Sequence, residues 1–313
     1  MEKIYDVIIV GAGPAGLTAA IYSGRARLST LIIEKANDGG QIVQTSEIVN
    51  YPGGIKNESG VTLTERMAYQ AKAFGAEKTY DTVKSVQLSG DIKVLNGERD
   101  IYKAKTVIIA AGAFPVGIGC SNEKEFNGKG ISYCATCDGA FFEDFEIYVV
   151  GGGDSAVEEA IYLTRFARKV TIIHRRDELR AVKSIQEKAF ANDKIEYMWN
   201  SRVIEVRGEG MLQSMIVEDT KTKETKEIFA DEDDGLFGLF VFIGFKPQSE
   251  IFEGKMEIEK GYIVTDENMK TSLPGVFAAG DIRKKSLRQV VTATGDGAIA
   301  ADQAVKYIDE LNI

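Results

Sequence analysis

The stretch YDVIIVGAGPAGLTAAIYSGRARLSTLII (residues 5–33) decides the fold class of this chain. It begins with a short β-rich run, continues through a glycine turn and a helical stretch, and ends in a second strand, which is the order of a βαβ unit. The stretch FEIYVVGGGDSAVEEAIYLTRFARKVTII (145–173) repeats this order 140 positions later. This period is far too long for a solenoid, so the sequence predicts two similar βαβ domains.

The first glycine turn has the full G-x-G-x-x-G pattern, in the order Gly11-Ala12-Gly13-Pro14-Ala15-Gly16. Gly11 allows the tight turn, Gly13 lets the backbone approach a pyrophosphate, and Gly16 lets helix and strand pack closely. The helix N-terminus offers unpaired N–H groups and the positive end of its dipole. Glu34 ends the next strand, where its carboxylate can accept hydrogen bonds from both hydroxyls of a ribose. Glycine turns also arise for packing alone, but this combination favours a dinucleotide site.

The second glycine turn is the G-x-G-x-x-A variant, in the order Gly151-Gly152-Gly153-Asp154-Ser155-Ala156. At the position equivalent to Glu34 it has His174, followed by Arg175, Arg176 and Arg180. A carboxylate would repel a 2′-phosphate, whereas arginines attract one and can bind it through paired hydrogen bonds. A solvated basic helix start is the alternative. Because the cluster lies where the ribose is discriminated, the sequence favours NADPH over NADH.

Two strand-like runs indicate how the repeated units are connected. VIIAAGAFP (107–115) comes shortly before the second unit, and LFVFIGFKP (239–247) follows it. We therefore predict an α/β protein with two Rossmann-like domains, the second inserted into the first. The first domain would comprise 1–115 and 247–313, and the inserted domain 116–246. A strand GVFAAGDI (275–282) and a final helix from about Asp296 would complete the first domain.

Composition and charge exclude several classes of protein. The chain has 313 residues with 38 Lys and Arg against 47 Asp and Glu, which gives a net charge of −9. This acidity argues against a nucleic-acid groove, which needs a basic stripe. No run approaches the roughly 18 apolar residues of a membrane span, and the first apolar run is too short for a signal peptide. We expect a cytoplasmic protein that binds neither nucleic acid nor membranes.

Two of the three cysteines form the motif CATC (134–137), which Asp138 follows directly. In a chain that is not exported, this spacing indicates redox or metal chemistry. A zinc site would need two more ligands, and the remaining Cys120 and His174 do not have finger spacing. We therefore predict no metal site and favour a redox-active dithiol.

Six motifs together carry a family resemblance: GAGPAG (11–16), GGQ (39–41), SYCATCDGAFF (132–142), GGGDSA (151–156), HRRDELR (174–180) and RQVVTATGDG (288–297). They resemble those of bacterial NADPH-dependent thioredoxin reductases of the low-molecular-weight class, over essentially the whole chain. The resemblance implies an FAD-containing homodimer. In it a hydride passes from NADPH to the flavin, the electrons pass to the enzyme's own disulfide, and the resulting dithiol reduces thioredoxin. It places FAD in the discontinuous domain, and NADPH and the dithiol in the inserted domain.

The resemblance also implies which residues contact the cofactors. The expected FAD contacts are Gly11, Gly13, Pro14, Ala15, Gly16, Glu34, Gly40, Gln41, Asn50, Gly280, Asp281, Arg288, Gln289 and Val290. The expected NADPH contacts are Gly151, Gly153, Asp154, Ser155, Ala156, His174, Arg175, Arg176 and Arg180.

The expected catalytic residues are Cys134, Cys137 and Asp138. By resemblance, Cys137 provides the flavin-side sulfur, and Cys134 is the thiolate that attacks the disulfide of thioredoxin. The leaving thiolate needs a proton, and the only histidine of the chain lies in the 2′-phosphate region. Asp138 is therefore the remaining candidate for the proton donor, provided that partial burial raises its pKa. A turn or helix-capping role for Asp138 is the alternative.

Two other functions stay open from the sequence. One is a related flavin-dependent dithiol/disulfide oxidoreductase that uses another donor, such as ferredoxin, or oxygen as oxidant. The other is a non-catalytic, nucleotide-binding redox sensor. The HRRxxxR cluster weighs against ferredoxin, because that donor would make the arginines redundant. Cys120 stands where the family has a Pro-Gly-Glu-like turn, and we expect it to be an inert filler, with redox sensitivity as the alternative.

Overall fold

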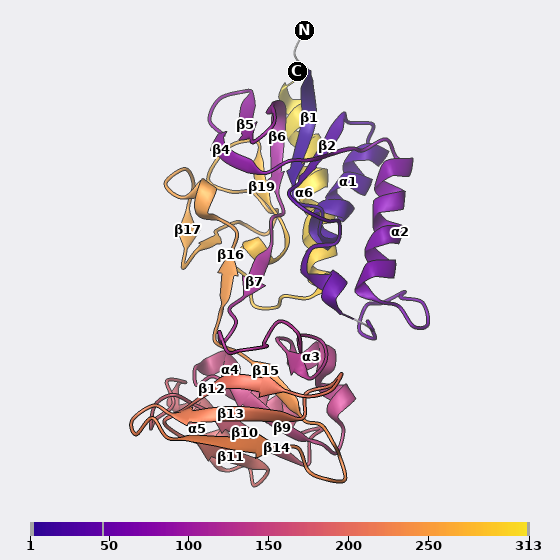
Figure 1. Ribbon diagram of the computed structural model, residues 1–313. Helices are drawn as coiled ribbons and strands as arrows, with labels where there is room; N and C mark the ends of the chain where they lie inside the picture. The colour runs from indigo at the N-terminus through magenta and orange to yellow at the C-terminus, as the bar shows by residue number, and fades with distance from the viewer. Residues whose placement is uncertain (1–2, 46, 312–313) are drawn as a thin grey trace. The chain divides into compact units, whose positions relative to one another are not determined.

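The chain folds into two compact units (Figure 1), and the computed structural model describes residues 3–45 and 47–311. Unit 1 comprises Met1–Phe114 and Lys246–Ile313, and unit 2 comprises Pro115–Phe245. Both limits lie one residue earlier than the sequence predicts. The chain crosses between the units in β7 (Ala113–Pro115) and β16 (Phe245–Pro247), and these two strands pair with each other.

Unit 1 is built on a mixed sheet. Its strands are β1 (Ile4–Val10), β2 (Thr30–Glu34), β3 (Glu77–Tyr80), β4 (Val83–Gln87), β5 (Lys93–Gly97), β6 (Ile101–Ile109) and β19 (Val276–Ala278). The order is β3-β2-β1-β6-β5-β4, with β19 also paired to β6. β1, β2, β3, β6 and β19 run parallel, whereas β5 and β4 are antiparallel to their neighbours. Every residue of β2 is buried, as expected of a parallel strand that is covered on both faces.

Three long helices cover this sheet: α1 (Pro14–Arg25), α2 (Gly60–Ala73) and α6 (Val290–Leu311). Helix α1 contacts both α2 and α6 (Figure 1). The approach of α6 to α1 depends on Gly297, where an added Cβ would lie 2.2 Å from the backbone oxygen of Ala15. Shorter elements of unit 1 are η1 (Gly40–Gln44), η3 (Glu250–Phe252), β17 (Ile258–Glu259), β18 (Tyr262–Ile263) and η4 (Gly280–Ile282).

Replacing Gly297 with alanine is expected to lower the free energy of unfolding by about 1–3 kcal/mol, because the new methyl group has no room between two helix backbones. Gly295 on the same helix provides a matched control, since an added Cβ there meets no described atom within 4 Å. Gly295→Ala should stabilise the protein by up to about 1 kcal/mol through helix propensity. Urea unfolding followed by circular dichroism measures both. Equal effects of the two substitutions would contradict this view of the contact.

Unit 2 contains two sheets. The first is fully parallel, with the order β11-β10-β9-β15-β8, and the second is antiparallel, with the order β12-β13-β14. The strands of the first sheet are β8 (Ile131–Ser132), β9 (Glu146–Val150), β10 (Lys169–Ile173), β11 (Ile195–Met198) and β15 (Gly238–Val241). Those of the second are β12 (Ser201–Arg207), β13 (Ser214–Asp219) and β14 (Thr225–Phe229). The helical elements are α3 (Ala135–Asp138), η2 (Gly139–Phe142), α4 (Asp154–Leu163) and α5 (Lys183–Phe190).

The prediction of an α/β fold with two Rossmann-like domains is confirmed, but some predicted elements have other limits. The run 107–115 is divided between β6 and β7, and 239–247 between β15 and β16. Glycines with left-handed backbone break these runs, with φ of +69° at Gly112 and +122° at Gly244. Only Val276–Ala278 of the expected strand 275–282 is a strand, because a 3₁₀ turn follows it.

The final helix begins at Val290, not near Asp296 as the sequence suggested. The backbone N–H of Gln289 donates to the Thr292 hydroxyl at 3.3 Å, which satisfies one of the free N–H groups at this helix start. Most residues from Val290 to Gly295 are β-branched or glycine and have low helix propensity, so this segment gives little helical signal in the sequence.

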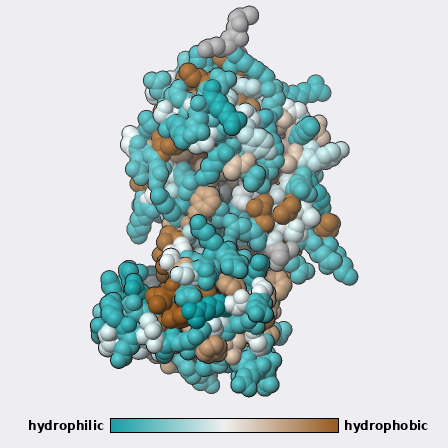
Figure 2. Space-filling model, in the orientation of Figure 1, coloured by the Kyte–Doolittle hydropathy of each residue, from teal (hydrophilic) through white to brown (hydrophobic). Residues whose placement is uncertain are grey.

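The surface of both units is mostly hydrophilic on the face drawn in Figure 2, with small separate hydrophobic areas. Within residues 3–45 and 47–311, no helix combines the length and the apolar character needed to cross a membrane.

Candidate functional site

The glycine turn of unit 1 leaves room at the start of α1. At Gly11, an added Cβ would lie 2.5 Å from the backbone oxygen of Ala110. At Gly16, it would lie 1.9 Å from the backbone oxygen of Gly11, so neither position has room for a side chain. Gly13 differs, because an added Cβ would meet only the backbone oxygen of Gly39, at 3.9 Å, among the described atoms. The helix then begins at Pro14, a residue whose missing N–H costs nothing at the first helical position. The open position thus lies beside the free N–H groups of α1.

Glu34, the last residue of β2, holds this turn in place. Its carboxylate accepts a hydrogen bond from the backbone N–H of Ala12 at 2.8 Å and from that of Ala36 at 3.0 Å. Only 8% of the residue is exposed. Each carboxylate oxygen has a second acceptor position, so these bonds leave capacity for ribose hydroxyls. The contact of Glu34 with the glycine turn was not predicted, because the motif indicates only its role at a ribose.

Asp281 lies in η4, directly after β19. Its Oδ1 atom is buried and has no hydrogen-bond partner within the described part of the chain, although Lys285 Nζ is 3.7 Å away. Burial raises the pKa of Asp281, and the charges of Lys285 and Arg288 oppose this shift. A buried acceptor without a partner is rare in folded proteins and indicates a place for a ligand donor, such as a hydroxyl group.

A buried charge network behind Asp281 was not predicted. Asp296 on α6 accepts from Arg283 Nη1, from Lys285 Nζ and from the backbone N–H of Gly280, each at 3.0 Å. The Asp296, Arg283 and Lys285 side chains are 10%, 13% and 8% exposed. The network therefore ties the turn that carries Asp281 to α6. A helix predicted from Val290 would have placed Asp296 on its buried side and revealed this role.

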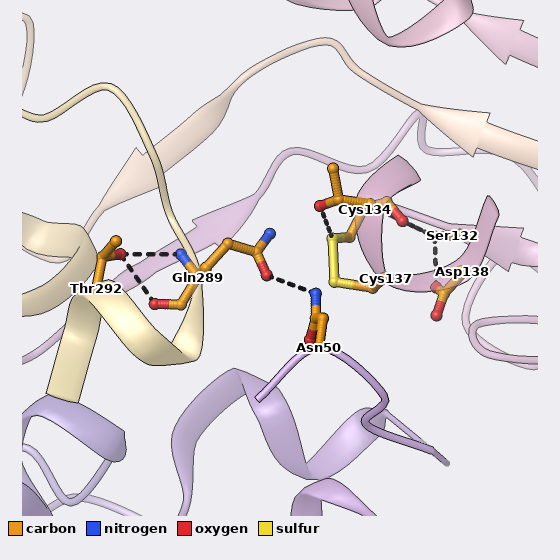
Figure 3. The surroundings of a disulfide bond; sticks show 8 residues. Asn50, Ser132, Cys134, Cys137, Asp138, Gln289 and Thr292 are labelled. Carbon is orange, nitrogen blue, oxygen red and sulfur yellow. Dashed lines mark hydrogen bonds between the residues drawn. A yellow bond between two sulfur atoms is a disulfide. The ribbon is translucent and has the colours of Figure 1, made fainter. Parts of the chain in front are cut away.

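The remaining residues expected at this site come from two distant segments that meet in unit 1. Asn50 Nδ2 donates to Gln289 Oε1 at 3.2 Å (Figure 3), across 239 positions of sequence. The Arg288 guanidinium lies 4.3 Å from the centre of the Tyr262 ring, and its buried Nε has no partner among residues 3–45 and 47–311. Val290 opens α6, while Gly40 and Gln41 open η1.

The glycine turn of unit 2 has the same plan. Gly151 has φ +149°, and an added Cβ there would lie 2.5 Å from Ala156 Cβ. At Gly152 it would lie 2.4 Å from Cε1 of His174, so the imidazole packs directly on the turn. At Gly153, which precedes α4, no described atom comes within 4 Å of an added Cβ. Space beside a helix start is therefore present here too.

The segment after β10 folds back onto this turn. The backbone N–H groups of Arg180 and Ala181 both donate to the Gly152 oxygen, at 2.7 and 3.1 Å. Asp154 Oδ1 accepts from the backbone N–H of Val182 at 2.8 Å, while the neighbouring Ser155 is exposed. The expected nucleotide-binding residues of the turn and of the basic segment are thus brought together.

His174 is the buried centre of this basic cluster, because Arg175, Arg176 and Arg180 around it are all exposed. The ring is 4% exposed, and its Nε2 has no hydrogen-bond partner in the described structure. Burial, followed by the charges of Arg180, Arg176 and Arg175, lowers the pKa of His174. Neutral His174 and three exposed arginines form a positively charged site for an anion.

His174 should make the stability of the protein depend on pH. Its folded pKa lies below the ordinary value of 6.5, so as the pH falls the unfolded chain takes up this proton first. The effect of His174 on the free energy of unfolding is therefore absent above pH 6.5 and becomes destabilising as the pH falls toward the folded pKa. His174→Gln should reduce the slope of the unfolding temperature against pH between about pH 7 and 5. Equal slopes in the two proteins would refute the assignment.

The dithiol motif of unit 2 forms a disulfide between Cys134 and Cys137 (Figure 3). Cys134 is the residue before α3, and Asp138 is the last residue of that helix. The Asp138 carboxylate accepts a hydrogen bond from the Ser132 hydroxyl at 2.6 Å (Figure 3). Burial raises the pKa of Asp138, and the bond from Ser132 opposes this shift. A disulfide beside a carboxyl group of raised pKa is suited to thiol exchange coupled to proton transfer.

Cys120 is separate from this pair and half-buried. Burial, and then the charge of Glu123, raise the pKa of its thiol to about 12. The thiol is therefore protonated at neutral pH, and a protonated thiol is a poor nucleophile. In the part of the chain that the structure describes, no three His, Cys, Asp or Glu side chains are grouped so as to hold a metal ion.

Comparison with known proteins gives the family. Residues 5–297 match the pyridine nucleotide-disulphide oxidoreductase family. The chain is 59% identical to a thioredoxin reductase of Peptoclostridium acidaminophilum over 99% of this chain and 98% of the relative. It is 52% identical to one of Bacillus subtilis (strain 168) over 99% and 96%.

Solved structures agree with these matches. A thioredoxin reductase from Streptococcus pyogenes MGAS5005 has a TM-score of 0.93 and 45% identity, over 98% of this chain and 99% of that one. That of Lactococcus lactis in the FR conformation has a TM-score of 0.66 and 44% identity over the same shares. The resemblance seen in the sequence is confirmed, and the chain belongs to the pyridine nucleotide-disulphide oxidoreductase family.

Proposed function

We propose that this protein is an NADPH-dependent thioredoxin-disulfide reductase that contains FAD. One observation carries the proposal: the Cys134–Cys137 disulfide lies beside the partly buried Asp138. It does so in a chain that is 50–59% identical, over nearly its whole length, to proteins named thioredoxin reductase. The alternatives of a ferredoxin-dependent enzyme and of a redox sensor are not favoured.

The residues of unit 1 fit FAD. The open position at Gly13 suits a pyrophosphate at the start of α1, and the carboxylate of Glu34 suits the ribose. Asp281 Oδ1, a buried acceptor without a partner in the described structure, suits a hydroxyl of the ribityl chain. When bound, FAD supplies a centre that accepts two electrons as a hydride and passes them to a disulfide.

The residues of unit 2 fit NADPH. The open position at Gly153 suits the pyrophosphate, and Arg175, Arg176 and Arg180 suit the 2′-phosphate that distinguishes NADPH from NADH. The imidazole of His174 lies under the turn, where it supports Gly152.

The cysteines then carry the electrons to thioredoxin. In the reduced enzyme, the Cys134 thiolate attacks the thioredoxin disulfide, which gives a mixed disulfide and a thioredoxin thiolate. Asp138 supplies the proton to that thiolate. The Cys137 thiolate next attacks Cys134 Sγ, which restores the Cys134–Cys137 disulfide and releases thioredoxin as a dithiol once its second thiolate takes a proton from water. Each turnover oxidises one NADPH and reduces one disulfide. We propose, from the family resemblance, that the enzyme is a homodimer in the cytoplasm.

Anaerobic spectroscopy tests this proposal. NADPH added to the FAD-loaded protein should bleach the flavin absorbance, and oxidised thioredoxin added next should restore it. Flavin that NADPH leaves oxidised would refute the function. Flavin that is reduced but not reoxidised by thioredoxin would also refute the function, and would point to another disulfide substrate.

A further inference from the structure

Ser132, the last residue of β8, makes three polar contacts with one hydroxyl group. Its Oγ donates to Asp138 Oδ2 at 2.6 Å, accepts from the backbone N–H of Cys134 at 3.1 Å, and lies 3.3 Å from the Cys134 backbone oxygen. The residue is 4% exposed. Figure 3 shows the hydrogen bond between Ser132 and Asp138. One buried hydroxyl thus contacts both the proposed proton donor and the backbone of the proposed nucleophile.

A hydroxyl has one proton and two acceptor positions, so these contacts cannot all be donated at once. Cys134 N–H occupies one acceptor position. When Asp138 is ionised, the Ser132 proton points to Oδ2. When Asp138 is protonated, the acid proton can point to the second acceptor position on Oγ, and the Ser132 proton can turn to the Cys134 oxygen. Rotation about a single C–O bond therefore satisfies both protonation states without movement of heavy atoms.

This arrangement matters because Asp138 is partly buried. A buried carboxyl group needs a hydrogen-bond partner in each protonation state, since losing one is costly. Burial and Ser132 are the influences found on the pKa of Asp138 within the described residues. The thiols of Cys134, before α3, and of Cys137, within α3, become titratable once the disulfide is reduced. Helix α4, which packs on α3, carries the carboxylates of Asp154, Glu158 and Glu159.

We propose that Ser132 is the positioning residue for proton transfer at Asp138, acting as a hydrogen-bond partner that reverses its direction when the acid gives up its proton. This inference rests on the proposed function. It extends that function, because it gives the Ser132 hydroxyl, which lies outside the CATC-Asp motif, a role in the proton-transfer step. The Ser132 hydroxyl also accepts from the backbone N–H of Cys134, so the same oxygen atom positions both Asp138 and Cys134.

Ser132→Ala is the decisive variant. Removing a hydrogen bond to the ionised carboxylate raises the pKa of Asp138, because the charged form loses more stabilisation than the neutral form. The rate of thioredoxin reduction falls as the pH rises through this pKa. In the variant this fall should therefore move to higher pH by about one to two units. Flavin reduction by NADPH should be unchanged, which shows that the protein is folded and loaded.

Two further variants separate the hydrogen-bonding role of the Ser132 hydroxyl from a purely steric role of the side chain. Ser132→Thr keeps the hydroxyl, so the rate of thioredoxin reduction should fall at the same pH as in the wild type. In an Asp138→Asn background, Ser132→Ala should cause no further change in the pH profile. If the rate of thioredoxin reduction by Ser132→Ala falls at the same pH as in the wild type, the inference is wrong and the proposed function stands. Failure of the wild-type protein to reduce thioredoxin would instead refute the function.

A spectroscopic measurement does not depend on whether the alanine variant folds. The infrared difference spectrum between wild type and Asp138→Asn, with labelled aspartate, isolates the Asp138 carboxyl band across pH. We expect a protonated carboxyl that donates a strong hydrogen bond at low pH. A band typical of a free carboxyl group would overturn the proposal.

Discussion

Replacing Cys134 with serine is expected to abolish the reduction of thioredoxin by NADPH while leaving the reduction of bound flavin by NADPH intact. A serine hydroxyl is essentially never ionised at neutral pH, so it cannot attack a disulfide as the thiolate does. The rate of thioredoxin reduction should fall by at least about 1,000-fold. Stopped-flow absorbance separates the two steps, because flavin bleaching and thioredoxin reduction are recorded independently.

Cys120→Ser is the matched control for this experiment. It makes the same chemical change at the half-buried thiol whose pKa is raised to about 12. We expect thioredoxin reduction at the wild-type rate. If Cys120→Ser abolished turnover and Cys134→Ser did not, the assignment of the active dithiol would be wrong.

Neutralising Arg175 and Arg176 is expected to remove the preference for NADPH. Both side chains are exposed next to His174, where they are free to meet a 2′-phosphate. Each charge-assisted contact that is lost should lower kcat/KM for NADPH by about 10- to 100-fold. The value for NADH should change little, since NADH has no 2′-phosphate. Steady-state kinetics of Arg175→Gln/Arg176→Gln with both nucleotides measures the ratio.

Arg165→Gln removes one positive charge elsewhere in unit 2, as each of the two substitutions does at the basic cluster. Arg165 lies beyond the C-terminal end of α4, whereas the glycine turn precedes the N-terminal end of this ten-residue helix. The two ends are about 15 Å apart, so the control should keep the NADPH preference. A loss of NADPH activity matched by an equal loss of NADH activity in the double variant would show that the arginines do not read the 2′-phosphate.

The sequence identified the βαβ units because their signals are local. Alternating strand, glycine turn and helix are encoded within about thirty residues, and Gly11 and Gly151 both take the left-handed backbone that their position requires. The position of His174 and the arginines relative to the second turn also follows from spacing within one βαβ unit. For these features, no contact between distant segments is needed.

The buried network around Asp296 could not be found in this way. Arg283, Lys285 and Asp296 are recognisable as charges in the sequence, but their burial depends on where α6 begins and how it packs. The β-branched residues and the glycine at its start have low helix propensity and give little helical signal in the sequence. The small size of Gly297 lets the helix approach α1, so tertiary packing outweighed local propensity.

The sequence by itself determined the fold class, the two glycine turns and the dithiol, and it gave Asp138 as the candidate acid, because each of these features depends on residues close together along the chain. Only the tertiary structure decided that Ser132 joins Asp138 to Cys134, that Asn50 meets Gln289, and that Glu34 bonds to Ala12. The physical reason is that a hydrogen bond depends on distance and angle within a few tenths of an ångström. Such geometry follows from packing of the whole unit and leaves no periodic pattern in the sequence.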